Sequence, residues 1–141
     1  FYIWYIRILE VNELKAKNID EKTYLFIISE EQSGGIGQRN NKWMSPIGNL
    51  YMSVKTKVKL KKEVNLLLIP QTVSLAIRST IKLYTNENMD IKWINDLFYK
   101  DKKISGVLIH SDSYNNNDEN EIILTLSLGV NLNVTPFNNS I

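Results

Sequence analysis

A glycine-rich and basic segment at residues 30–43, EEQSGGIGQRNNKW, holds the first residues whose types could do chemistry. Its glycines are Gly34, Gly35 and Gly37. Glycines let several backbone N–H groups converge on an anion, and they let a ligand approach the backbone closely. Arg39 and Lys42 add positive charge, and Trp43 offers a flat apolar ring. A phosphate group beside an aromatic ring indicates a nucleotide, and an ordinary surface loop is the alternative.

The same segment does not match the standard nucleotide-binding signatures. It has no G-x-x-x-x-G-K-[ST] phosphate loop, and Asn40 stands where a dinucleotide-binding fingerprint has its third glycine. The next predicted element is a strand, whereas that fingerprint opens a helix. Because single glycine motifs often match by chance, the phosphate site and the surface loop both stay open at this point.

Two later segments add polar residues and further glycines. The segment at 91–110, IKWINDLFYKDKKISGVLIH, contains Lys92, Asn95, Asp96, Lys102, Lys103 and Gly106. A glycine inside a strand marks close approach by a ligand or another backbone, while lysines at a hairpin turn are usually only solvated. The segment at 128–134, LGVNLNV, ends a strand with Gly129, Asn131 and Asn133, which also suits a plain turn.

Strands must position most of these segments. The residue patterns predict strands over 1–9, 23–29, 49–60, 89–96 and 122–134. Residues 97–110 are expected to form a hairpin that turns at Lys100–Lys102, and residues 70–84 an amphipathic helix with Pro70 in its first turn. A short helix is expected at 11–18. These elements favour an α+β fold in which a mostly antiparallel sheet and few helices pack as two layers.

The expected strand at 49–60 alternates between apolar and polar residues. Its apolar positions are Leu50, Met52, Val54 and Val58. Its other face carries Tyr51, Ser53, Lys55 and Lys57. This alternation predicts a half-buried strand, with the apolar face in the core and the polar face in solvent.

Composition excludes several classes of protein. The chain has 141 residues, of which 43% are apolar, so one folded domain with a real core is expected. There is no cysteine and one histidine, which excludes a disulfide framework and a cysteine or histidine metal cluster. A net charge of +2 gives no argument for nucleic acid, and no apolar run reaches membrane-spanning length. The chain starts without methionine, so we expect a fragment of a longer protein.

Four motifs, in order, resemble the catalytic domain of biotin–protein ligases. They read GIGQRNNKWMSP, KWIND, KKISG and GVNLN here. The family carries a G-R-G-R-x-G-type loop with W-x-S-P, then K-W-P-N-D, K-[IL]-x-G and G-[IV]-N-x-N. The resemblance implies one catalytic domain over 1–141. It also implies a mixed, mostly antiparallel sheet flanked by helices, related to class II aminoacyl-tRNA synthetases.

The resemblance also implies a two-step reaction that uses ATP and Mg²⁺. The carboxylate of biotin attacks the α-phosphate of ATP, which gives biotinyl-5′-AMP and pyrophosphate. An acceptor lysine then attacks the mixed anhydride; it lies on the biotin carboxyl carrier domain of a biotin-dependent carboxylase such as acetyl-CoA carboxylase. Neither nucleic acid nor membrane is an expected partner, a homodimer is possible, and the expected location is intracellular, cytoplasmic or organellar. The alternatives are a lipoate–protein ligase and a non-catalytic module that binds biotin or its adenylate.

Site residues follow from the resemblance position by position. Lys103 matches the family lysine that bridges carboxylate and phosphate, and Arg39 is the second catalytic cation. The implied biotin-binding residues are Gln32, Gly35, Gly37, Gly106 and Asn12. The implied nucleotide-binding residues are Gln38, Arg39, Lys42, Trp43, Asn95, Asp96 and Asn131. No residue of the chain is assigned as a metal ligand.

The sequence departs from the family pattern in two places. Aligned on the motif tryptophan, the two family arginines fall on Ile36 and Gln38. We therefore expect Arg39, one position later, to point toward the phosphate site in place of Gln38. The family's Ser-Thr-Asn stretch, which contacts the ureido group of biotin, reads Glu-Val-Asn at residues 10–12 here.

Overall fold

The structure is a computed structural model, and it describes residues 2–8, 24–60, 65–113 and 121–133. Its strands are β1 (Tyr2–Ile8), β2 (Tyr24–Glu31), β3 (Leu50–Lys59), β4 (Asp90–Lys92), β5 (Asp96–Tyr99), β6 (Lys102–Ser113) and β7 (Glu121–Val130). Its helices are α2 (Leu68–Thr85) and the short 3-10 helix η1 (Gln38–Asn40). The helix expected at 11–18 lies outside the described residues.

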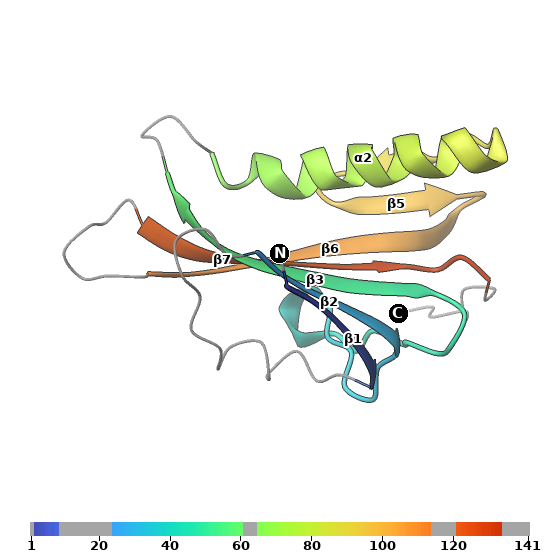
Figure 1. Ribbon diagram of the computed structural model, residues 1–141. Coiled ribbons are helices and arrows are strands. Elements are labelled where there is room, and N and C mark those ends of the chain that lie inside the picture. The colour runs from blue at the N-terminus through green and yellow to red at the C-terminus, as the bar shows by residue number, and fades with distance from the viewer. Residues whose placement is uncertain (1, 9–23, 61–64, 114–120, 134–141) are drawn as a thin grey trace.

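The seven strands form one sheet in the order β1-β2-β3-β7-β6-β5-β4. β1 pairs with β2 in parallel, and every other neighbouring pair is antiparallel. Helix α2 runs along one face of the sheet and contacts β6 and β5 (Figure 1). This arrangement confirms the expected α+β fold with a mixed, mostly antiparallel sheet.

Helix α2 packs on the sheet through an apolar stripe of helical spacing. The stripe consists of Val73, Ile77 and Ile81. It contacts a buried cluster formed by Val107, Leu128 and Val130. Leu50 and Met52 of β3 pack against the same cluster, so the predicted apolar face of β3 does face the core. Pro70 lies in the first turn of α2, where a missing N–H removes no intrahelical bond.

The region between α2 and β6 differs from its prediction. The single strand expected over 89–96 is wrong: β4 ends at Lys92, a turn follows, and β5 begins at Asp96. The predicted hairpin is confirmed, because β5 and β6 pair across a turn at Lys100 and Asp101. Both turn residues have positive φ, 47° and 62°, as the tight turns of two-residue hairpins require.

The polar face of β3 is buried, which corrects the prediction that it is solvated. Tyr51, Ser53 and Lys55 expose 2%, 9% and 3% of their surface. The end of the glycine-rich segment and the residues that follow it cover part of this face. The hydroxyl of Tyr51 donates to the carbonyl of Pro46 at 2.8 Å, and the indole of Trp43 contacts the backbone of β7. Periodicity alone does not reveal that a loop packs on the polar side.

Candidate functional site

Strand register builds two rows of side chains on the sheet face opposite α2. The first row crosses β2, β3, β7 and β6 through Ser29, Tyr51, Gly129 and Gly106. The second row crosses the same strands through Ile27, Ser53, Ser127 and Leu108. All eight residues line a cavity of about 250 Å³. A floor of small and polar residues leaves room for a ligand on this face.

Most of the sequence-predicted site residues meet at this cavity. Those that line it are Gln32, Gly37, Gln38, Trp43, Asn95, Asp96, Lys103 and Gly106. Four others are described but do not line it: Gly35, Arg39, Lys42 and Asn131. Asn12 lies outside the described residues. Segments far apart in sequence are thus brought together as the four motifs predict.

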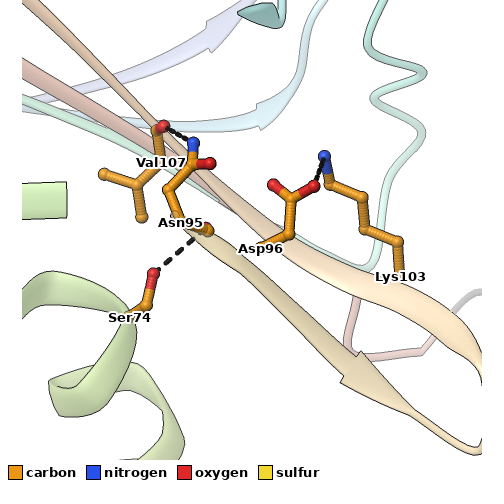
Figure 2. Close-up of polar contacts among 5 residues, drawn as sticks. All are labelled: Ser74, Asn95, Asp96, Lys103 and Val107. Atoms are coloured by element: carbon orange, nitrogen blue, oxygen red, sulfur yellow. Dashed lines mark hydrogen bonds and ion pairs between the residues drawn. The ribbon is translucent and has the colours of Figure 1, made fainter. Parts of the chain in front are cut away.

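Lys103 holds the positive charge of the cavity. Its Nζ lies 2.7 Å from Oδ2 of Asp96, an ion pair between β6 and β5 (Figure 2). The same Nζ lies 5.5 Å from the centre of a Trp43 ring, within cation–π range. The two side chains of the ion pair are 40% and 25% exposed, so the charge remains accessible to an anionic ligand.

Trp43 lies over a pair of facing glycines. Gly106 and Gly129 are register partners on β6 and β7. A β-carbon at Gly129 would lie 2.7 Å from Nε1 of Trp43, and one at Gly106 would lie 3.4 Å from Cε of Lys103. The expected close approach at Gly106 is therefore made by the side chains of Lys103 and Trp43. Nε1 of Trp43 is buried and has no hydrogen-bond partner among the described residues.

Ser45 is the serine of the W-x-S-P motif, and although no role for it is predicted from the sequence, it ties the glycine-rich segment together. Its Oγ accepts a hydrogen bond from Nε2 of Gln32 at 3.0 Å and donates to the carbonyl of Trp43 at 3.1 Å. The backbone of Trp43 donates to the carbonyl of Gly35 at 2.8 Å. A β-carbon at Gly35 would lie 2.6 Å from Oγ of Ser45 and would also clash with the Trp43 carbonyl. Gly35 is thus required for packing here and does not line the cavity.

The structure does not orient Arg39 as expected. Gln38 and Arg39 are both exposed, but Gln38 lines the cavity and Arg39 does not. Arg39 and the next residue, Asn40, have positive φ, 57° and 61°. Asparagine adopts this left-handed conformation more readily than most residues, but arginine does not, so the type of Arg39 does not predict the turn. Lys42 is also exposed and away from the cavity.

Asn95 acts as a structural link next to Asp96. It is 4% exposed, and its Nδ2 donates to the carbonyl of Val107. Its own carbonyl accepts from Oγ of Ser74, which α2 supplies, at 3.0 Å (Figure 2). These bonds fix the β4–β5 turn, which leads into Asp96, to both β6 and α2. At the end of β7, the backbone N–H of Asn131 donates to the carbonyl oxygen of Ile104 at 2.7 Å.

Membrane-spanning helices and metal clusters are both absent from the described part of the chain. In the described ranges, no helix has the length and apolar character needed to cross a bilayer. Over the same ranges, no three side chains of the types His, Cys, Asp or Glu gather as metal ligands.

Comparison with known proteins agrees with this geometry. The sequence profile of the "Biotin/lipoate A/B protein ligase family" matches residues 7–133. The human biotin–protein ligase is 35% identical over 94 residues, 62% of this chain and 13% of that protein. The chloroplastic biotin–protein ligase 1 of Arabidopsis thaliana is 30% identical over 141 residues, 95% of this chain and 36% of that protein.

Solved structures show the same fold. The biotin protein ligase of Leishmania major in complex with biotinyl-5-AMP has a TM-score of 0.74 and 26% identity, over 95% of this chain and 58% of that one. The ligase of Aquifex aeolicus in complex with biotin and ATP has a TM-score of 0.73 and 25% identity, over 96% and 55%. The chain therefore spans less than two thirds of each of these relatives. With a family match over residues 7–133 and the shared fold, the chain belongs to the biotin/lipoate A/B protein ligase family.

Proposed function

We propose that residues 1–141 are the catalytic domain of an ATP-dependent biotin–protein ligase. One observation carries the proposal: Lys103 of the KKISG motif projects into the cavity between Asp96 and the ring of Trp43. A cation next to an aromatic ring, in a cavity with small side chains on its floor, suits a carboxylate that meets a nucleotide phosphate. Relatives solved with biotin and ATP, and with biotinyl-5-AMP, support this choice of ligands.

The first step would form biotinyl-5′-AMP. A biotin carboxylate oxygen attacks the α-phosphorus of ATP, the bond to the bridging oxygen breaks, and pyrophosphate leaves. Two anions approach each other in this step, so a fixed cation lowers the barrier where negative charge accumulates. Lys103 is the lysine that lines the described cavity. Its ammonium group would contact both the carboxylate and the phosphate, and Trp43 would stack against the adenine side of the product.

Mg²⁺ would enter with the triphosphate. Such sites usually hold Mg²⁺ through one or two carboxylates together with phosphate oxygens. Asp96 is the acidic side chain among the residues that line the cavity, so it is the protein ligand that fits the ion. The role of Lys103 would then change, because its ammonium group would exchange the Asp96 carboxylate for the incoming anions.

The second step would transfer biotin to a lysine of a biotin carboxyl carrier domain. The neutral acceptor amine attacks the carbonyl carbon of the mixed anhydride and the acyl C–O bond to the phosphate breaks. AMP leaves with that oxygen, and the amine nitrogen releases one proton as the amide forms. Water would hydrolyse the same anhydride, so the site must cover it. The glycine-rich segment, whose residues Ile36–Gln38 and Asn40 line the cavity, is the part of the chain that we propose covers the intermediate.

A substrate-swap assay tests the proposal. Pyrophosphate release would be measured for the purified chain with ATP and biotin, with ATP and lipoate, and with ATP alone. A ligase for biotin releases pyrophosphate with biotin and far less with lipoate. Release with lipoate in preference to biotin would identify a lipoate–protein ligase. Binding of biotin without any release would indicate a non-catalytic module and would contradict the proposal.

A further inference from the structure

Two serines that belong to none of the four motifs form a pair in the floor of the cavity. Ser53 on β3 and Ser127 on β7 are register partners, and both line the cavity. Their Oγ atoms lie 2.7 Å apart, and Ser53 is 9% exposed. Their neighbours in the same row are apolar, Ile27 on β2 and Leu108 on β6. The hydroxyl pair is thus a polar spot in an otherwise apolar row.

The pair has hydrogen-bonding capacity that the protein does not use. Each hydroxyl has one proton to donate and two lone pairs to accept with. Their mutual bond uses one proton and one lone pair. Neither hydroxyl makes another hydrogen bond within the described residues. One proton and several lone pairs are therefore left for a partner in the cavity, and buried polar groups are normally satisfied.

The pair lies away from Lys103 along the strands, on the far side of the Gly106–Gly129 row. Along β6, Lys103 precedes Gly106, and Leu108, which faces Ser127, follows it. The row of Ser53 and Ser127 is two residues beyond the Gly106–Gly129 row, which is about 7 Å along the strands. A ligand with its carboxylate at Lys103 would extend along the strands beside the Trp43 ring, which covers Gly106 and Gly129, and would bring its far end to the two hydroxyls.

We infer that Ser53 and Ser127 together recognise the polar head of the acid substrate and select a cyclic urea over an apolar ring. The inference rests on the proposed function and names the specificity of the same site. The urea of biotin offers two N–H donors and one carbonyl acceptor, which the pair can match on both sides. The dithiolane of lipoate has no donor and only weak acceptors. Residues 10–12, the stretch that the resemblance assigns to the ureido group, read Glu-Val-Asn and lack the family's two hydroxyls.

Equilibrium binding of biotin and of lipoate to the whole chain tests the inference. Calorimetry would compare the native chain with Ser53→Ala, Ser127→Ala and the double variant. Loss of two neutral hydrogen bonds should weaken biotin binding roughly ten- to a hundredfold in the double variant. Lipoate binding should change less than about threefold. The control is Ser105→Ala, which removes a buried hydroxyl of β6 that has no partner among the described residues and does not line the cavity; it should leave both affinities unchanged.

The outcomes separate this inference from the proposed function. If the double variant binds biotin within about threefold of the native chain, the pair does not recognise the head, although the ligase proposal survives. An equal loss of affinity for biotin and for lipoate would likewise overturn the inference alone. If the native chain binds no biotin, the proposed function fails and the inference fails with it. The single variants give the same comparison if the double variant does not fold, as judged by circular dichroism.

Discussion

The indole of Trp43 lies so close to Gly129 that a β-carbon at residue 129 would lie 2.7 Å from Nε1. Gly129→Ala must therefore displace the ring, whereas Gly106→Ala meets its nearest atom, Cε of Lys103, at 3.4 Å. We expect Gly129→Ala to destabilise the fold by about 1–3 kcal/mol, as overpacking usually does, and Gly106→Ala to cost less. Urea unfolding of both variants measures the difference.

Tryptophan fluorescence reports the displacement directly. In a background with Trp4→Phe and Trp93→Phe, the emission of Trp43 should shift toward longer wavelength in Gly129→Ala, because the ring becomes more exposed. Gly106→Ala should keep the native emission. Equal stability and identical spectra for the two alanine variants would contradict the contact between Trp43 and Gly129.

The glycine-rich segment makes a prediction about retention of the intermediate. Gln38 lines the cavity and Arg39 does not. Arginine at position 38 would add charge-assisted hydrogen bonds to the adenylate phosphate, which are about twice as strong as neutral ones. Gln38→Arg should therefore slow the release of biotinyl-5′-AMP, and Arg39→Ala should release it at the native rate. Faster release from Arg39→Ala would mean that the loop turns Arg39 inward when the ligand binds.

Because of Tyr51, the free energy of unfolding should depend on pH in the alkaline range. Burial raises the pKa of its phenol above the ordinary value of 10.0, although hydrogen bonds with Asn49 and Ser45 act in the other direction. Well below pH 10 the phenol is neutral in both the folded and the unfolded chain, so Tyr51 makes its full contribution to stability. As the pH rises further, the unfolded chain ionises first and the folded state loses that contribution.

Comparing the stability of the native chain with that of Tyr51→Phe at several pH values should show this loss. Near neutral pH the native chain should be more stable by about 1 kcal/mol, because the hydroxyl bonds the carbonyl of Pro46. This difference should shrink as the pH rises above about 10. Urea unfolding from neutral to strongly alkaline pH measures it, with Tyr84→Phe as the control, since Tyr84 is 85% exposed. A difference that stays constant over this range would contradict a raised pKa.

Local pattern predicted much of the fold. The alternation at 49–60 and the apolar stripe at 70–84 each identified an element whose bounds match the structure within two residues. These signals come from residues near each other in the chain. The first three motifs and Gly129 of the fourth also predicted which distant segments meet at the cavity, because each carries a residue that lines it.

The prediction errors arose where packing between distant parts of the chain determines which side chains are buried and which contacts they make. Alternation identified the two faces of β3 but could not show that the Trp43–Pro46 segment covers the polar one. The roles of Ser45, the serine of the W-x-S-P motif, and of Ser74 were not predicted because their partners, Gln32 and Asn95, lie 13 and 21 residues away. The left-handed turn at Arg39 and Asn40 decides whether Gln38 or Arg39 faces the cavity, and only the asparagine is a residue type that favours it.

The rate of biotinyl-5′-AMP formation in Lys103→Ala tests the central claim most directly. Biotin, ATP and Mg²⁺ would be mixed with excess enzyme without an acceptor protein, and the product resolved by chromatography. Loss of one stabilising cation should slow the step about 10²–10³-fold. Lys102→Ala is the matched control, since Lys102 is exposed and does not line the cavity, and it should react at the native rate. A native rate in Lys103→Ala would contradict the claim that Lys103 is where the carboxylate and the α-phosphate meet.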